Sequence, residues 1–284
     1  MAKKVNRESL PDIQNTPDTR GKNIERVGIS NVHIPLRLHR KNFDDKLPAT
    51  VTADVSMYVS VKSEDRGLNM SRLMETLMTY ESQMISSKFI ERIIKEMIEK
   101  NNSNDGYIKI AFKYFVERLA PVSQLRGVHG YDCAFIGRYA NGKYDFAIEV
   151  NVVGTNLCPC SREISDHGAH NQRNHIRVKL SPTDDFYWIE DIIDLVEKEL
   201  SCPIYPLLKR EDEKYVTEKA YDNSKFCEDV ARDISIVLQN LNTLNRFKIK
   251  VSNEESIHPH NAVSYIVRRL KGNQWVIDDR GLQS

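Results

Sequence analysis

The feature that most constrains the fold is an alternation of apolar and polar residues over positions 49–61. Every second residue is apolar, and the set that shares one face is Val51, Ala53, Val55, Met57, Val59 and Val61. A period of two is typical of a strand with one buried face. The same period returns from Tyr107, and Asn141-Gly142 between two further strand-like runs (130–139 and 143–152) predicts a tight hairpin. We therefore expect an antiparallel sheet.

Helical periodicity lies between these predicted strands. Residues 71–81 indicate a short helix, and Ser86 or Ser87 begins a second helix with one apolar stripe. In the second half, 174–180 and the closing segments 246–251 and 262–270 are predicted strands, 188–200 is a predicted helix, 209–222 is polar, and a long helix starts at Ser224. This order predicts an α+β fold in which the helices pack on one face of antiparallel sheets.

Composition excludes several classes of protein. The 284 residues suffice for about two domains, so the chain can bury a core without disulfide staples. The 41 basic and 40 acidic residues give a formal net charge of +1, which disfavours general nucleic-acid binding. No apolar run approaches the roughly 20 residues of a membrane-spanning helix, and no apolar segment follows the basic start of the chain. We expect a cytoplasmic protein without a membrane partner.

The cysteines direct attention to one stretch. Their odd number, five, argues against a disulfide framework in a chain of this kind. Residues 154–173 hold the densest group of reactive side chains, among them Cys158, Cys160 and His170. A thiolate and an imidazole twelve residues apart can share a divalent ion if the chain between them forms a loop, and both suit zinc. The stretch is therefore a candidate for a metal site with an exchangeable water.

Other interpretations of the same residues stay open. A closed structural zinc would need four protein ligands, a redox pair would more normally be Cys-x-x-Cys, and the thiols could be inert loop residues. A third ligand could come from the acidic run 211–213 or from His258 and His260, which flank a proline that favours extended backbone before it. Glu228, early in the last long helix, is by itself an ordinary first-turn carboxylate.

The run from Gly154 to Arg173 resembles the signature of the type IB GTP cyclohydrolases, metal-dependent enzymes of the first step of bacterial folate synthesis. The likeness extends along most of the chain, over 12–26, 66–72, 207–210, 213–218, 226–230 and 258–260. The chain differs from the usual family pattern at Glu211, where proline is expected, and at Asn69, where many members carry histidine.

The resemblance implies a tunnelling fold: an N-terminal arm at 1–25, a first module at 26–153, and a second at 154–284 with most of the active-site residues. It implies a homotetramer with active sites at subunit interfaces. Matched residue by residue, the metal ligands are Cys158, His170 and Glu213; the carboxylate that binds guanine is Glu228; the catalytic residues are Cys158, His258 and His260. The ion would be Zn or Mn, or else Fe.

The chemistry that the resemblance implies fits these residue types. Release of purine carbon 8 as formate needs water attack, and a divalent metal lowers the pKa of its water from 15.7 toward about 7. Histidines can move the protons, and one carboxylate can accept both guanine N1–H and its 2-amino group. Cations for the triphosphate are available at Arg162, Arg173, Lys209 and Arg210. An archaeal-type relative that releases a cyclic phosphate and a non-catalytic zinc-binding assembly protein are the alternatives.

Overall fold

The computed structural model describes residues 13–41, 49–80, 83–183 and 187–278. Within them lies one ten-stranded sheet whose strand pairs are all antiparallel. The strands are β1 (Ile24–Leu38), β2 (Ala49–Val61), β3 (Gly106–Leu119), β4 (Arg126–Ala140), β5 (Lys143–Leu157), β6 (Asn171–Pro182), β7 (Cys202–Pro203), β8 (Leu244–Glu254), β9 (Asn261–Lys271) and β10 (Gln274–Ile277). Their order in the sheet follows the chain, except that β7 pairs with β5 beside the main path.

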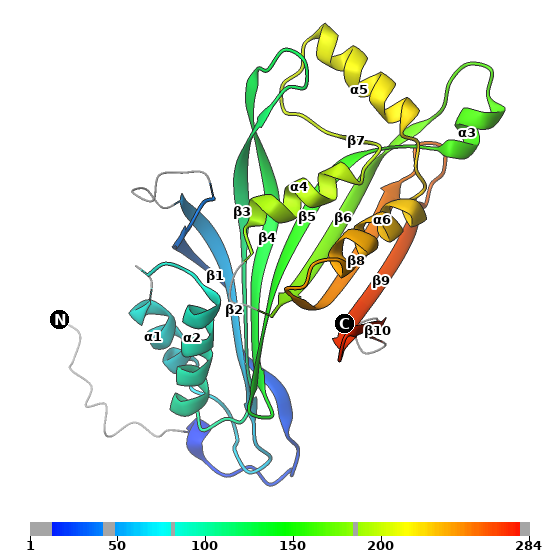
Figure 1. The fold of residues 1–284 in the computed structure, drawn as a ribbon. Coiled ribbons are helices and arrows are strands. Elements are labelled where there is room, and N and C mark those ends of the chain that lie inside the picture. Colours follow the sequence, from blue (N-terminus) through cyan, green and yellow to red (C-terminus); the bar gives the residue numbers. More distant parts are fainter. Residues whose placement is uncertain (1–12, 42–48, 81–82, 184–186, 279–284) are drawn as a thin grey trace.

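The helices are α1 (Met70–Thr79), α2 (Ser87–Lys100), α3 (Pro159–Ile164), α4 (Ile189–Lys198), α5 (Arg210–Asp222) and α6 (Cys227–Gln239), with a 3-10 helix at Ile13–Asn15. The apolar stripe of α2 packs on β3 and β4, while α4 packs on β5 and α6 on β8 and β9 (Figure 1). The expected α+β architecture with helices on one sheet face is confirmed.

The core lies between that face and the helices because each strand sends every second side chain inward. In β2 the predicted alternation is confirmed, and Ala53, Val55 and Met57 are fully buried. Ser86 accepts a hydrogen bond from the Phe89 amide and so caps α2, as the sequence indicates. The Asn141-Gly142 hairpin is present, with positive φ at both residues.

Several elements differ from the sequence-based expectation. The first strand, β1, was not predicted, because two register shifts against β2 break its alternation. The polar segment 209–222 contains α5, whose buried residues are only Asp212 and Ala220, so no apolar stripe marks it as a helix. The short elements α3, β7 and β10 were also missed.

Two places in the structure bear on the predicted division of the chain into an N-terminal arm and two modules. Residues 13–18 of the expected arm contact the chain itself, since the Asp18 amide donates to Glu64 O and the Arg66 amide to Thr16 O. Residues 1–12 lie outside the described part. The boundary at 153/154 falls inside β5, and a single sheet spans both sides of it. The two-module division stays a prediction.

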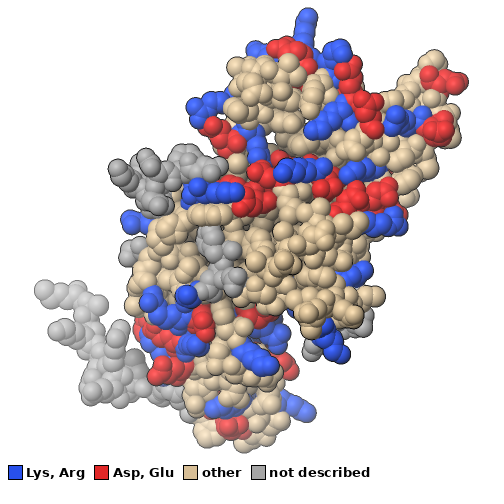
Figure 2. Space-filling view, in the orientation of Figure 1, with Lys and Arg blue, Asp and Glu red and all other residues tan. Residues whose placement is uncertain are grey.

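Figure 2 shows acidic and basic side chains interspersed over the side that carries the helices. No helix in the described residues is long and apolar enough to cross a membrane.

Candidate active site

Cys158 and His170 are brought together by the pairing of β5 with β6. Leu157, the last residue of β5, lies opposite Asn171, the first residue of β6. The thirteen-residue connection between the two strands therefore leaves and returns at one point, where the Cys158 amide donates to His170 O at 3.1 Å. The loop that the sequence analysis required between these two residues is present.

The connection is shaped by α3. Pro159 occupies the first turn of that helix, where its missing N–H is not needed, and Cys158 is the N-cap. The Ser161 amide lies 3.5 Å from Cys158 Sγ, and the Ser161 hydroxyl accepts from the His170 amide at 3.2 Å. These bonds fix the half-buried Cys158 sulfur, whereas Cys160 is exposed and takes no part in them.

The His170 ring is oriented by a residue that the sequence analysis did not find. Ser256 Oγ lies 3.2 Å from His170 Nδ1, and it belongs to the connection between β8 and β9. A partner on one ring nitrogen fixes the ring and leaves Nε2 to bind a ligand. Beside it, Gln172 Nε2 donates to Glu255 Oε1 at 3.2 Å, which attaches the same connection to β6.

His258 and His260 lie in that connection, both exposed. Their rings stack, with centroids 5.0 Å apart and planes at 17°. The expectation that the two imidazoles project to a similar side is thus confirmed, although the backbone forms bends there and not an extended strand. Because Ser256 and Glu255 hold the connection against His170 and Gln172, the two histidines come from the same end of the sheet as Cys158.

Glu228 lies in the first turn of α6 and is exposed. The neighbouring Cys227 thiol is 3.2 Å from Glu228 Oε2 and 3.2 Å from Ser264 Oγ on β9. Burial raises the pKa of the Cys227 thiol, so it stays protonated and can donate to the carboxylate.

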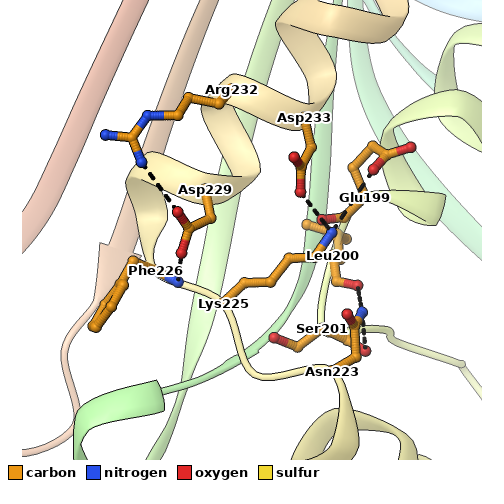
Figure 3. Close-up of polar contacts among 9 residues, drawn as sticks. All are labelled: Glu199, Leu200, Ser201, Asn223, Lys225, Phe226, Asp229, Arg232 and Asp233. Carbon is orange, nitrogen blue, oxygen red and sulfur yellow. Dashed lines mark hydrogen bonds and ion pairs between the residues drawn. The ribbon is translucent and has the colours of Figure 1, made fainter.

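The start of α6 is held by a group of contacts that we call the linker clamp: Asn223 and Lys225, with Glu199, Leu200, Ser201 and Asp233 (Figure 3). Lys225 Nζ donates to Glu199 O at 3.0 Å and pairs with Asp233 at 2.9 Å, and Asn223 Nδ2 donates to Leu200 O at 2.8 Å. The Lys225 amide donates to Leu157 O at 3.2 Å. The clamp therefore ties the helix that carries Glu228 to the residue before Cys158.

Glu213 is not part of this group. It is in the first turn of α5, next to Asp212, whose buried carboxylate accepts hydrogen bonds from the amides of Val122 and Ser123 at the β3–β4 connection. The other end of α5 approaches the site, where Arg162 Nη1 lies 3.4 Å from Asp222 O. Nine residues at about 1.5 Å each place Glu213 about 14 Å back along the helix.

Within the described ranges, no three His, Cys, Asp or Glu side chains gather closely enough to hold a metal ion. One chain thus presents Cys158 and His170 together and Glu213 apart from them.

The candidate phosphate-binding cations are also divided between two places. Arg173 lines a cavity of about 330 Å³ with Glu255 and Ser256, beside His170. Lys209 and Arg210 line another cavity, of about 570 Å³, near the β3–β4 connection. Arg162 stacks over Tyr221 at 4.6 Å in α5.

Among the described residues, four buried amide side chains lie on β5, β6 and β8 near the site: Asn156, Gln172, Asn174 and Asn253. Their burial was not predicted. Asn156 Nδ2 is 3.5 Å from Asn253 Oδ1, and both side chains are buried. Asn174 is fully buried, and neither of its amide atoms has a partner among the described residues. Buried amides without a protein partner are normally satisfied by internal water.

Comparison with known proteins gives a consistent result. The family model described as type I GTP cyclohydrolase folE2 matches residues 10–264. GTP cyclohydrolase FolE2 of Methylobacillus flagellatus is 43% identical over 265 residues, which cover 92% of this chain and 98% of that protein. The Nitrosomonas eutropha protein of the same name is 41% identical over 267 residues, covering 94% and 98%.

Among solved structures, the uricase from Arthrobacter globiformis matches with a TM-score of 0.57 at 8% identity, covering 92% of this chain and 98% of that one. A uricase from Bacillus fastidious matches with a TM-score of 0.50 at 7% identity, covering 87% of this chain and 93% of that one. At such identity the likeness concerns the fold alone, and it confirms the tunnelling fold.

Proposed function

Because this chain belongs to the type I GTP cyclohydrolase FolE2 family, we propose that it converts GTP and water into 7,8-dihydroneopterin triphosphate and formate, by the type IB reaction. It is a hydrolase of cyclic amidine C–N bonds that acts in the first step of tetrahydrofolate biosynthesis. The observation that carries this conclusion is the juxtaposition of Cys158 and His170 at the β5–β6 connection, inside the sequence run that the resemblance rests on.

Cys158, His170 and Glu213 would hold a divalent ion, Zn, Mn or Fe. The donor set fits: a sulfur whose position is fixed by the Ser161 amide, an imidazole whose Nε2 is left open by Ser256, and a carboxylate. When bound, such an ion would make a water molecule acidic enough to attack purine carbon 8 near neutral pH.

Glu213 would reach the other two ligands from a second subunit. Supporting this, Glu213 lies about 14 Å along α5 from the end that approaches α3, and the three ligands do not gather in the described part of one chain. This arrangement agrees with a homotetramer that has its active sites at subunit interfaces.

Mixed oligomers test this point. Cys158→Ala and Glu213→Ala chains, each inactive alone, should regain part of the activity when they are unfolded together and refolded. Some sites then combine an intact Cys158 from one chain with an intact Glu213 from the other. If both ligands belonged to one subunit, every mixed site would lack a ligand, and the mixture would stay inactive.

The remaining residues act on substrate and protons. Glu228, on the first turn of α6, would accept guanine N1–H and the 2-amino group, which selects guanine over adenine. His258 and His260, exposed and stacked at the same end of the sheet, would move protons as the imidazole ring of the purine opens. A location in the cytoplasm and the lack of a nucleic-acid partner stay predictions.

The direct test is a product assay. Purified protein is incubated with GTP and Zn, Mn, Fe or Mg, the products are oxidised, and neopterin fluorescence is recorded together with formate. Fluorescence with one or more of these ions is the expected result. No fluorescence with any ion, or a product whose mass corresponds to a cyclic phosphate, would overturn the assignment.

A further inference from the structure

The helix-free face of the sheet carries a row of basic residues that the proposed reaction does not use. Along β6 and β8, buried residues alternate with basic ones that face away from α4 and α6. These basic side chains are His175, Arg177 and Lys179 on β6, and Arg246, Lys248 and Lys250 on β8. Acidic residues lie among them: His175 Nε2 is 3.6 Å from Glu254 Oε2, and Glu149 lies opposite Lys179 in the β5–β6 register.

The strand register sets like charges against each other. Arg177 lies opposite Lys250, and the next pair on that face is Lys179 opposite Lys248. Like charges in directly opposite positions of an antiparallel pair are destabilising. Among the described residues, no carboxylate forms an ion pair with Arg177 or Lys179, although Glu149 lies opposite Lys179 on the other side. Folding therefore places positive charge at Arg177 and Lys179 that the described residues only partly neutralise.

A cavity of about 350 Å³ lies over the second of these pairs. Its lining includes the apolar residues Ile136 and Ala147 and the aromatic ring of Tyr107, over which Arg26 stacks at 4.1 Å. Five basic residues line it: Arg26, Arg138, Lys179, Arg246 and Lys248. Of the two acids in the lining, Asp278 is paired with Arg246 at 2.6 Å, and Asp145 lies opposite Arg138 in the β4–β5 register.

Lys179 is the group most affected by this environment. Burial lowers its pKa, and the nearby Arg246 and Lys109 lower it further, against the opposite effect of Glu149 and Asp145. An anion placed beside the Lys179 ammonium group would stabilise its charged form, and would so offset the lowering of the pKa by burial and by the nearby cations.

We propose that this cavity binds the triphosphate chain of a small molecule, either free tripolyphosphate or a nucleoside triphosphate. A chain of phosphates matches several cations spread over adjacent strands, which lie about 4.8 Å apart. The volume lies at the lower end of the range for small-molecule sites, about 300 to 1,000 Å³.

The cavity is separate from the candidate active site of the same chain. Lys179 follows His170 by nine residues along β6, which is about 30 Å of strand. One GTP molecule cannot span that length, so within one chain the cavity is a second site.

The test compares the full-length protein with Lys179→Gln, and uses Lys198→Gln on the helix side as a control with the same change of charge. Tripolyphosphate is titrated calorimetrically in the presence of a chelator, and the thermal midpoint is recorded with tripolyphosphate or with sodium chloride at equal ionic strength. We expect tripolyphosphate to bind and stabilise the wild type and the control. Lys179→Gln should bind it about tenfold more weakly or worse, the loss of one charge-assisted hydrogen bond.

Without added anion, the thermal midpoint of Lys179→Gln should be no lower than that of the wild type. The substitution removes one of the two like charges, Lys179 and Lys248, that face each other across the strands. Equal tripolyphosphate affinity in the wild type and Lys179→Gln, or equal stabilisation by sodium chloride, would overturn the proposal.

Titrations with GTP and with guanosine distinguish a nucleoside triphosphate from free tripolyphosphate as the ligand. Tighter binding of GTP than of tripolyphosphate at the Lys179-dependent site identifies a nucleotide, equal binding identifies the free chain, and binding of guanosine alone contradicts the proposal. The neopterin assay of the proposed function is independent of all these outcomes.

Discussion

Replacement of Lys225 by methionine tests whether the linker clamp positions α6. Methionine keeps most of the side-chain length but removes the ammonium group, which lies 3.0 Å from Glu199 O and 2.9 Å from the Asp233 carboxylate. The Lys225 side chain is 16% exposed, whereas Asp233 is 37% exposed and partly screened by water. Hydrogen bonds to charged groups contribute about 1.5 to 3 kcal/mol and exposed ion pairs less than about 1 kcal/mol, so we expect a loss of about 2 kcal/mol.

A loss of that size lowers the thermal midpoint of a chain this long by about 4 to 8 °C. The matched control is Lys214→Met, which removes an ion pair with Glu218 within α5 whose side chains are 73% and 59% exposed. Pairs of this kind contribute only about 0.3 to 0.5 kcal/mol, so the control should change the midpoint by less than about 2 °C. Calorimetry at fixed protein concentration measures both variants, since oligomer stability depends on concentration.

The same variant should affect substrate binding. Lys225 belongs to the segment that ties Leu157 to the first turn of α6, so loss of the clamp should displace Glu228 and raise KM for GTP. Lys214→Met should leave KM unchanged. Equal thermal midpoints for the two variants would refute the energetic argument, and an unchanged KM for Lys225→Met would refute the positioning role.

Three further predictions concern single side chains. Cys158→Ala should abolish both neopterin formation and bound metal, while Cys160→Ala should do so much less; equal losses, measured by fluorescence and metal analysis, would mean that the wrong thiol is assigned. Glu228→Gln should raise KM for GTP by about 10- to 150-fold, the effect of losing charge-assisted hydrogen bonds, and an unchanged KM would exclude the guanine contact. Burial alone would raise the pKa of Asp212, but hydrogen bonds from the Ser123 hydroxyl and nearby amides hold it below its ordinary 3.8. The Asp212 carboxylate therefore contributes its full stabilisation of the folded state above about pH 4. Asp212→Asn should have a lower free energy of unfolding than the wild type in that range, and the two values should converge as the pH falls further. A difference in unfolding free energy that stays constant down to about pH 2 would contradict this.

The sequence predicted the elements whose packing is regular. In β2 and α2 the apolar residues face one side without interruption, so period alone located them to within a residue or two. The strand β1 escaped because its bulges shift the alternation, and α5 escaped because its buried side chains are a carboxylate and an alanine. In both, tertiary contacts decide the structure.

Without the family resemblance, the candidate site was predictable only where its parts are close in the chain. Cys158 and His170 share one motif, and the pairing of β5 with β6 brings them together. Ser256 and Lys225 support the site from other elements, and their sequence positions show no periodicity or motif that would single them out. Only the topology places them there.

The order of the strands has a consequence for synthesis of the chain. From β1 to β6 each strand pairs with the one made just before it, so the sheet can grow while the ribosome is still at work. Then β6 must wait for β8, because Leu244 follows Pro182 by 62 positions. At about 5 to 20 residues per second this leaves β6 as an open edge for roughly 3 to 12 seconds. Exposed edges invite pairing with other chains, and charged side chains suppress it. The basic row of β6 thus protects the nascent sheet against aggregation before it has any ligand to bind.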